Sequence, residues 1–281
     1  MDQPAYPLSE DSQGVGARQR ARGVVRATFA LTARRTTLAQ LRQSGGLRLA
    51  LPRSGAVAEA VLINTGGGMA GGDAAELDFA LEPGAQALVT TQSAEKIYRG
   101  DDGAAHLSAH LSLGAAARLE WLPQETILFD GAKLTRRLVI DLAGDSSLLF
   151  VEAVTFGRTA FGEDRIDCFL RESWRVRRAG KLIFAEEMRL DAAAALLPRP
   201  ALGGGARAMA TLLMAAPDPA AALEAARAAF GPAVEAIEWG ASLVEGLVIA
   251  RALSPSPALL RAAIVGALAG LRGRAAPRVW S

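Results

Sequence analysis

Two glutamates in apolar surroundings are the residues of this sequence with the clearest chemical potential. Read as one strand, 121–130 places Glu125 on a face with large apolar side chains, and Glu152 occupies the apolar face of 148–156 in the same way. An unpaired carboxylate is costly to keep charged in such a place. Either each glutamate is balanced by a buried arginine, or both line a hydrated passage. Arg158 and Glu163, in the loop 157–163, are candidates for the same network.

The remaining metal-binding side chains are few. The chain has two histidines, His106 and His110, and one cysteine, Cys168. The histidines lie four apart on the polar side of an expected strand, so their Cα atoms are roughly 13 Å apart at ~3.3 Å per residue. We therefore expect solvated histidines and a packing cysteine. Because tight nickel or zinc sites favour imidazole and thiolate, any metal chemistry must use carboxylates, backbone oxygens, water or a partner.

The glycine-rich stretch 66–71 satisfies the spacing of the dinucleotide fingerprint. That motif requires a helix starting at the loop, whereas an alternating strand, 76–82, follows here. A glycine-rich turn, with Asp73 capping it or facing a partner, is the simpler interpretation, and a nucleotide-binding oxidoreductase is the alternative. No Ser/His/Asp or Cys/His set with a credible base is present, so we expect no enzyme.

Composition and periodicity indicate the elements that position these residues. The 281 residues are 51% hydrophobic with a net charge of +2, which fits a globular protein and not a nucleic-acid binder. One cysteine and no signal peptide or apolar span predict a cytoplasmic, soluble protein. Residues 1–20 are expected to form a flexible tail, and 21–281 a single domain with a β body at about 21–197.

Period-two alternation predicts strands at 76–82, 106–113, 135–142 and 148–156, and a hairpin at 169–190 that turns at Ala179-Gly180.

After the linker-like segment 198–205 comes a helix-containing part, about 206–275. Asp218 and Ser256 are predicted N-caps, each followed by proline, and the helices end near Gly231 and Gly273. Residues 209–215 and 241–250 are expected to be strands.

Five short sequence motifs, occurring in a fixed order along the chain, resemble those of one protein family. They are 64–73 (NTGGGMAGGD), 90–99 (TTQSAEKIYR), 121–131 (WLPQETILFDG), 157–163 (GRTAFGE) and 277–280 (PRVW). Together they are similar to the urease accessory proteins UreD, called UreH in some bacteria. The motifs span roughly residue 22 to the C-terminus. Five motifs in this order are far more specific for the family than any one of them alone.

The resemblance implies a mainly β fold: a β-helix-like, two-layered sheet body with a small helical part near the C-terminus. It implies a chaperone that forms a complex with UreF and the GTPase UreG, and inserts nickel into apo-urease, with UreE as the indirect donor. No tightly bound cofactor is implied, only transient nickel. A water-filled tunnel is proposed for the family, and a pure scaffold without nickel contact is the alternative.

On this basis we expect carboxylates to pass nickel transiently; the candidates are Glu125, Glu152, Asp73, Asp130 and Glu163. Candidates for partner contacts or structural roles are Gln92, Lys96, Tyr98, Arg99, Arg158 and Trp280. We expect Trp280 to be buried, because a terminal tryptophan is otherwise frayed and exposed.

Overall fold

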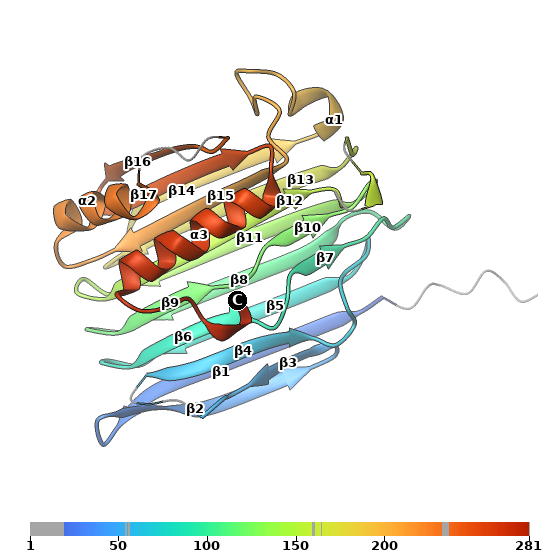
Figure 1. Cartoon of the computed structure of the whole chain (residues 1–281). Coiled ribbons are helices and arrows are strands. Elements are labelled where there is room, and N and C mark those ends of the chain that lie inside the picture. The colour runs from blue at the N-terminus through green and yellow to red at the C-terminus, as the bar shows by residue number, and fades with distance from the viewer. Residues whose placement is uncertain are drawn as a thin grey trace, which may run out of the picture.

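Strands dominate the computed structural model, which describes residues 20–53, 55, 57–158, 161–163, 165–231 and 236–280 (Figure 1). Residues 1–19 of the expected tail lie outside this description. The strands are β1 (Arg22–Thr32), β2 (Arg35–Ser44), β3 (Leu47–Ala50), β4 (Ala58–Asn64), β5 (Ala74–Leu81), β6 (Gln86–Thr91), β7 (Glu95–Ile97), β8 (Ala105–Leu113), β9 (Arg118–Leu122), β10 (Thr126–Leu128), β11 (Lys133–Leu142), β12 (Ser147–Phe156), β13 (Phe169–Arg178), β14 (Lys181–Leu190), β15 (Ala208–Ala215), β16 (Glu238–Val244) and β17 (Leu247–Ser254). The helices are α1 (Ala193–Leu196), α2 (Pro219–Phe230), α3 (Pro257–Arg272) and a final 3₁₀ turn, Arg278–Trp280.

The strands form two facing sheets, and the chain winds between them. The seven-stranded sheet has the order β14-β13-β11-β8-β5-β1-β2. The ten-stranded sheet has the order β16-β17-β15-β12-β9-β6-β4-β3, with β10 beside β12 and β7 beside β10. From β5 to β13 successive long strands alternate between the sheets and pair in parallel within each. This solenoid-like winding confirms the mainly β, two-layered fold class.

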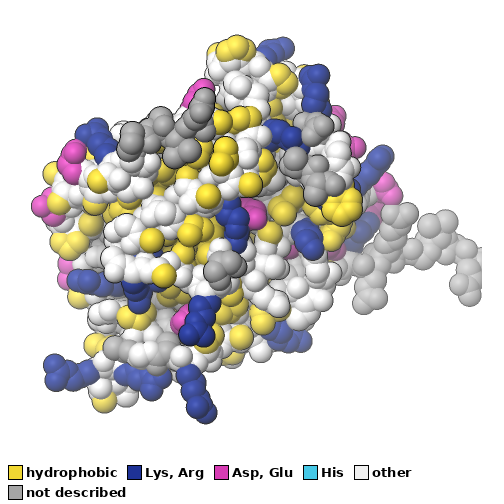
Figure 2. All heavy atoms as spheres, in the orientation of Figure 1, with side chains coloured by type: hydrophobic (Ala, Val, Ile, Leu, Met, Phe, Trp, Pro, Cys, Tyr) yellow, Lys and Arg dark blue, Asp and Glu magenta, His cyan; other side chains and the backbone are white. Residues whose placement is uncertain are grey.

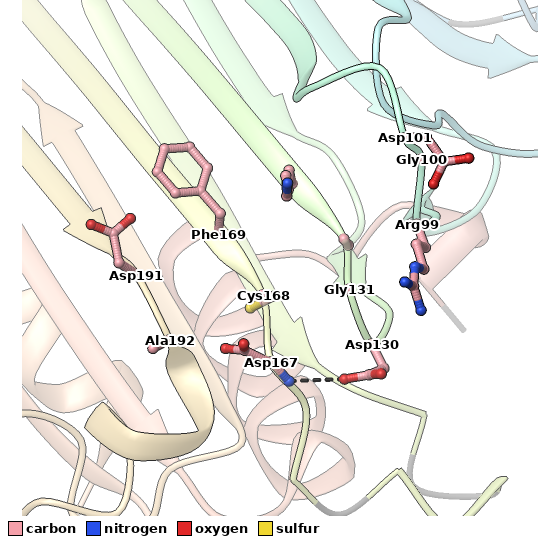
Figure 3. Close-up of a pocket in the computed structure, with 12 residues that line it drawn as sticks. Arg99, Gly100, Asp101, Asp130, Gly131, Asp167, Cys168, Phe169, Asp191 and Ala192 are labelled. Atoms are coloured by element: carbon pink, nitrogen blue, oxygen red, sulfur yellow. Dashed lines mark hydrogen bonds between the residues drawn. The ribbon is translucent and has the colours of Figure 1, made fainter.

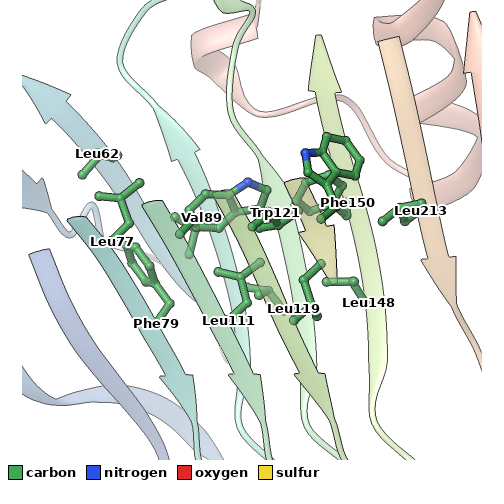
Figure 4. Packing of buried hydrophobic residues seen from close by; sticks show 14 of the residues in the cluster. Leu62, Leu77, Phe79, Val89, Leu111, Leu119, Trp121, Leu148, Phe150 and Leu213 are labelled. Atoms are coloured by element: carbon green, nitrogen blue, oxygen red, sulfur yellow. The ribbon is translucent and has the colours of Figure 1, made fainter. Parts of the chain in front are cut away.

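The main core fills the space between the two sheets. Each inner face contributes every second side chain of its strands, as the period of two requires. Figure 4 shows these apolar side chains meeting from both layers. Aromatic pairs cross the gap edge to face: Phe79 lies 5.3 Å from Trp121 and Phe150 lies 5.5 Å from Trp174, centroid to centroid.

The long predicted strands are confirmed as β5, β8, β11 and β12, and the hairpin as β13–β14. At its turn, Ala179 and Gly180 both have positive φ (48° and 82°), the geometry that matches the twist of a two-residue hairpin. The strand expected at 209–215 is β15. The single strand expected at 241–250 is wrong, because a turn at Glu245-Gly246 divides the segment between β16 and β17.

The continuous strand expected at 121–130 is also wrong. β9 ends at Leu122 and β10 begins at Thr126, and Pro123 lies in the gap between them. Proline has no N–H to donate, so it cannot continue a sheet ladder. The break shifts the alternation by one residue. Because Trp121 faces the core between the sheets, an unbroken strand would also turn residues 125 and 127 toward the core. Instead, Thr126 and Leu128 face it.

Helix α3 lies across the outer face of the ten-stranded sheet (Figure 1). Both predicted N-caps are confirmed: Asp218 accepts from the Ala221 amide at 3.0 Å and Ser256 from the Leu259 amide at 3.3 Å. The face of α3 with Leu260, Ile264 and Leu268 is buried in a second apolar cluster. No helix in the described ranges is long and apolar enough to cross a membrane.

Trp280 closes the second cluster from the end of the chain. Its side chain is 3% exposed, its indole Nε1 donates to the Leu122 carbonyl at 3.0 Å, and the Arg261 guanidinium lies 5.1 Å above its ring. Arg261 also donates to the Trp280 carbonyl at 3.0 Å. The expectation of a buried terminal tryptophan is therefore confirmed.

Replacing Trp280 should destabilise the fold. Trp280→Ala removes a fully packed ring and leaves a cavity, so we expect the free energy of unfolding to fall by about 3–5 kcal/mol. Trp280→Phe keeps most of the ring and loses the bond to the Leu122 carbonyl, and should cost less. Urea denaturation measures the free energy of unfolding of both variants. A loss below about 1 kcal/mol for the alanine variant would show that the C-terminal turn contributes little to stability.

Candidate functional site

Arg136, Glu152 and Glu172 form a cluster of buried charges between the sheets. Arg136 comes from β11 and Glu172 from β13 in the seven-stranded sheet, whereas Glu152 comes from β12 in the ten-stranded sheet. Each occupies the apolar half of its strand's alternation. The side chains of Arg136 and Glu172 are each 4% exposed, and that of Glu152 is 11% exposed. The cluster therefore joins the two layers inside the main core.

Arg136 is the centre of the hydrogen bonds in this cluster. Its Nη1 lies 2.5 Å from Glu152 Oε2, its Nε donates to Glu172 Oε1 at 2.8 Å, and its Nη2 also pairs with Glu172. Nη1 further reaches the Thr126 hydroxyl at 3.3 Å. The Trp121 indole donates to Glu152 Oε1 at 3.3 Å. For Glu152, the structure shows the pairing with arginine, which is one of the two arrangements that the sequence left open.

One guanidinium lies between two carboxyl groups, so the interior would carry a surplus negative charge if both carboxyl groups were ionised. Burial raises the pKa of Glu152; Arg136 opposes the increase, and neighbouring Glu172 adds to it. Burial opposes the charge of Arg136, but the two carboxylates outweigh it and raise its pKa. The cluster is thus a site where one more positive charge, a proton or a cation, would be favoured.

Glu95 is the third interior carboxylate, and like Glu152 it lies on the inner side of the ten-stranded sheet. On β7 it shares a face with Ile97, which lies in the main core, and it is the register partner of Thr126. Asn64 Nδ2 donates to both of its oxygens, at 3.0 and 3.2 Å. Glu95 lines a cavity of about 60 Å³ with Asn64 and Thr91. Burial raises its pKa from 4.5 to about 7, and the Asn64 hydrogen bond partly offsets this.

Glu125 does not point inward, so that expectation is wrong. It lies in the segment between β9 and β10 and pairs with Arg261 of α3 at 2.6 Å, with 22% of its side chain exposed. The same arginine donates to the Gln124 side chain at 3.1 Å. The alternation shift at Pro123 is the cause: it turns Glu125 to the outer side, under α3.

The other carboxylates named from the sequence have local partners. Asp73 accepts from the amides of Ala70 and Ala21, both at 2.8 Å, so it caps the glycine-rich turn as expected. Glu163 pairs with the Arg158 side chain and also accepts from its backbone N–H.

A pocket of about 620 Å³ opens near the starts of β11 and β13 (Figure 3). Asp130 lines it and accepts from the Asp167 backbone N–H at 2.9 Å; Arg99 lies on the same side as Asp130, and Asp191 lies across the pocket. Cys168 lines the pocket between Asp167 and Phe169 and is 5% exposed. Burial raises the pKa of this thiol to about 12, so it stays protonated at neutral pH and offers no thiolate.

The predicted partner-contact residues lie in several places. Lys96, Tyr98 and Arg158 line a second pocket, of about 500 Å³, on the outer side of the ten-stranded sheet. Gln92 borders the small cavity beside Glu95. Partner roles for these residues, for Arg99 and for Trp280 stay predictions.

Metal and nucleotide sites of the usual kinds are not formed by the described residues. No group of three or more His, Cys, Asp or Glu side chains there is arranged to hold a metal. His110 pairs with Asp141 at 2.9 Å and His106 is exposed, so both histidines lie on the outer face, as predicted. The glycine-rich loop leads into β5, so the helix that the dinucleotide fingerprint requires does not follow it.

The sequence reasoning missed Arg136, Glu172 and Glu95. For Arg136 and Glu172 a signal existed, because each interrupts the apolar half of a clear alternation, as Glu152 does. Glu95 gave no such signal, because β7 has only three residues and shows no measurable period.

The surplus charge predicts unequal mutational effects. Arg136→Met leaves two buried carboxylates uncompensated and should lower the free energy of unfolding by about 3–5 kcal/mol. Glu152→Gln leaves Arg136 and Glu172 as a balanced pair, so we expect a loss near 1 kcal/mol, the size of a hydrogen bond. Chemical denaturation at pH 7 measures both, and equal losses would contradict a surplus charge.

Glu95 predicts a pH-dependent stability difference. Its pKa of about 7 in the fold exceeds 4.5, so its contribution to stability is full below pH 4.5 and is lost as pH rises through 7. Glu95→Gln is neutral at every pH. Its free energy of unfolding, relative to the unsubstituted protein, should rise by on the order of 3 kcal/mol between pH 4.5 and 8. A difference that does not change with pH would show that Glu95 is not held in a desolvated site.

Known proteins resemble this chain over nearly its whole length. A family model described as UreD urease accessory protein matches residues 21–281. Urease accessory protein UreD of Methylobacterium sp. (strain 4-46) is 48% identical over 94% of this chain and 95% of its own. UreD 2 of Methylorubrum populi is 46% identical (97% and 94%), and UreD of Xanthobacter autotrophicus is 45% identical (99% and 96%). The chain therefore belongs to the UreD urease accessory protein family.

Proposed function

We propose that this protein is a non-catalytic chaperone that helps to insert nickel into apo-urease, as part of a cytoplasmic complex with UreF and the GTPase UreG. Family membership supports a role in urease maturation. The sequence has no Gly-Lys-Ser/Thr phosphate loop, so GTP hydrolysis must come from a partner. UreE would act indirectly, as nickel donor.

The chemistry of the chain fits nickel as a passing cargo. Two histidines and one cysteine are too few for a strong store of nickel, and the Cys168 thiol stays protonated. Carboxylate oxygens bind nickel more weakly than thiolate or imidazole do, so they can release it. We therefore assign any contact with nickel to carboxylates and to water.

The observation that carries this proposal is the row of interior carboxylates. Glu95 and Thr126 are neighbours across β7 and β10, and Thr126 is bonded to the Arg136 cluster with its surplus negative charge. The buried indole N–H of Trp174 has no acceptor among the described residues, and such donors are usually satisfied by ordered water. We infer a hydrated interior route past Glu95, Glu152 and Glu172, in which Glu125 takes no part.

A scaffold without nickel contact is the second candidate. It is favoured by the pairing of Glu152 and Glu172 with Arg136, since ion-paired carboxylates have fewer free lone pairs for a metal. The hydrogen bonds of Asp73, Asp130 and Glu163 favour it in the same way.

Nickel loading separates the two candidates. Urease should be matured with Glu95→Gln, Glu152→Gln or Glu172→Gln in place of the unsubstituted protein, with Glu224→Gln on the exposed side of α2 as the matched control. We expect the interior variants to keep their thermal midpoint at pH 7 within a few degrees and to bind UreF, while the nickel content of urease falls several-fold. If all three interior variants load urease fully with nickel, the interior route is excluded and the scaffold without nickel contact is the remaining candidate.

A further inference from the structure

Glu95 borders a small cavity between the ends of β4 and β6 and the start of β7, and we call it the Glu95 cavity. It holds about 60 Å³, which is room for a few water molecules at roughly 10–15 Å³ each. Half of its lining residues offer side-chain oxygens: Asn64, Thr91, Gln92, Ser93 and Glu95. Because Gln92 and Ser93 are exposed whereas Glu95 is half-buried, the cavity lies between the surface and the interior.

Glu95 differs from neighbouring carboxylates because it forms no ion pair within the described ranges. Inside the protein, Glu152 is paired with Arg136. On the outer face of the ten-stranded sheet, Figure 2 shows acidic side chains beside Lys or Arg side chains, and Glu125 is paired there with Arg261. The side-chain partner of Glu95 is a neutral amide. Its oxygen lone pairs are therefore not neutralised by a fixed positive charge, and a cation would find them available.

The glycine-rich turn forms one wall of the Glu95 cavity through Gly67 and Gly68. The turn is fixed against β7, because the Met69 amide donates to the Lys96 carbonyl at 2.8 Å. At Gly68 the φ angle is 146°, and a Cβ there would lie 2.4 Å from the Tyr98 ring and 2.6 Å from the Lys96 carbonyl oxygen. Only glycine therefore lets the turn lie so close to the strand that carries Glu95.

Asn64 joins this turn to the carboxylate. Its Nδ2 donates to both oxygens of Glu95, at 3.0 and 3.2 Å, and to the Gly68 carbonyl at 3.2 Å. Its Oδ1 accepts from the Gly66 amide at 3.0 Å. One side chain thus holds both the carboxylate and the wall beside it, so the oxygens of the cavity are in place before a ligand arrives.

We propose that the Glu95 cavity is the mouth of the interior route, a site where one divalent cation with part of its water shell passes between the outside and the inside of the protein. Glu95 supplies the anionic ligand, and water and the neutral side-chain oxygens supply the rest. Oxygen ligands with a single carboxylate bind nickel weakly, as a site of passage requires. Beyond Glu95, its neighbour Thr126 leads to the Arg136 cluster.

The one positively charged residue in the lining does not fill this site. Lys96 follows Glu95 on β7, so its side chain points to the opposite side of the strand, where it also borders the second pocket. The proposal rests on the proposed function, because it names the place where the cation enters or leaves its route.

Equilibrium dialysis of the purified protein against Ni²⁺ tests the site. Glu95→Gln keeps the size of the side chain and removes its charge, so we expect it to bind one Ni²⁺ fewer per chain, or to bind it with a Kd at least tenfold higher. Asn64→Asp puts a second carboxylate beside Glu95. It should lower the thermal midpoint without nickel and tighten the Kd for Ni²⁺ several-fold. Glu82→Gln makes the same change at an exposed carboxylate after β5, and should bind like the unsubstituted protein.

The results for urease loading separate this proposal from the proposed function. If the unsubstituted protein binds no Ni²⁺, or Glu95→Gln binds Ni²⁺ as it does, the mouth is overturned. If Glu95→Gln loads urease fully while Glu152→Gln or Glu172→Gln does not, the mouth is overturned and the interior route stands. If none of the three variants lowers the nickel content of urease, the interior route fails, and the mouth fails with it.

Discussion

Arg136 carries its positive charge between the two sheets, where its side chain is 4% exposed and its partners are two carboxylates and the Thr126 hydroxyl. Glu172 meets it from the same sheet and Glu152 from the opposite one, so the cluster ties the layers together by charge as well as by apolar contact. A buried ion pair adds little net stability over apolar packing, but losing one partner of it is costly. The two sheets therefore have to be stacked in the register that brings these three strands together.

On the opposite side of the ten-stranded sheet, Arg261 has a comparable linking role. From α3 it reaches Glu125, the Gln124 side chain and the Trp280 carbonyl. One side chain thus connects the helix, the break between β9 and β10, and the end of the chain. The apolar cluster beneath α3 supplies the stability, and the arginine sets how the helix lies relative to the break.

The short strands β7 and β10 connect the interior with the outer pocket. Alternation places Glu95 and Thr126 inside, near the charged cluster, and Lys96 and Ile127 outside, in the second pocket of about 500 Å³.

The sequence by itself determined the long strands, the Ala179-Gly180 turn, the helix caps and the poverty in metal-binding side chains, because these depend on local periodicity and composition. It also showed that Glu152 lies inside, since the alternation of β12 is long and regular. Only the tertiary structure decided which other carboxylates join it. Pro123 breaks the alternation and turns Glu125 outward, whereas Glu172 finds Arg136 across 36 residues of chain. Contacts between strands so distant follow from how the sheets stack, and no local pattern records that.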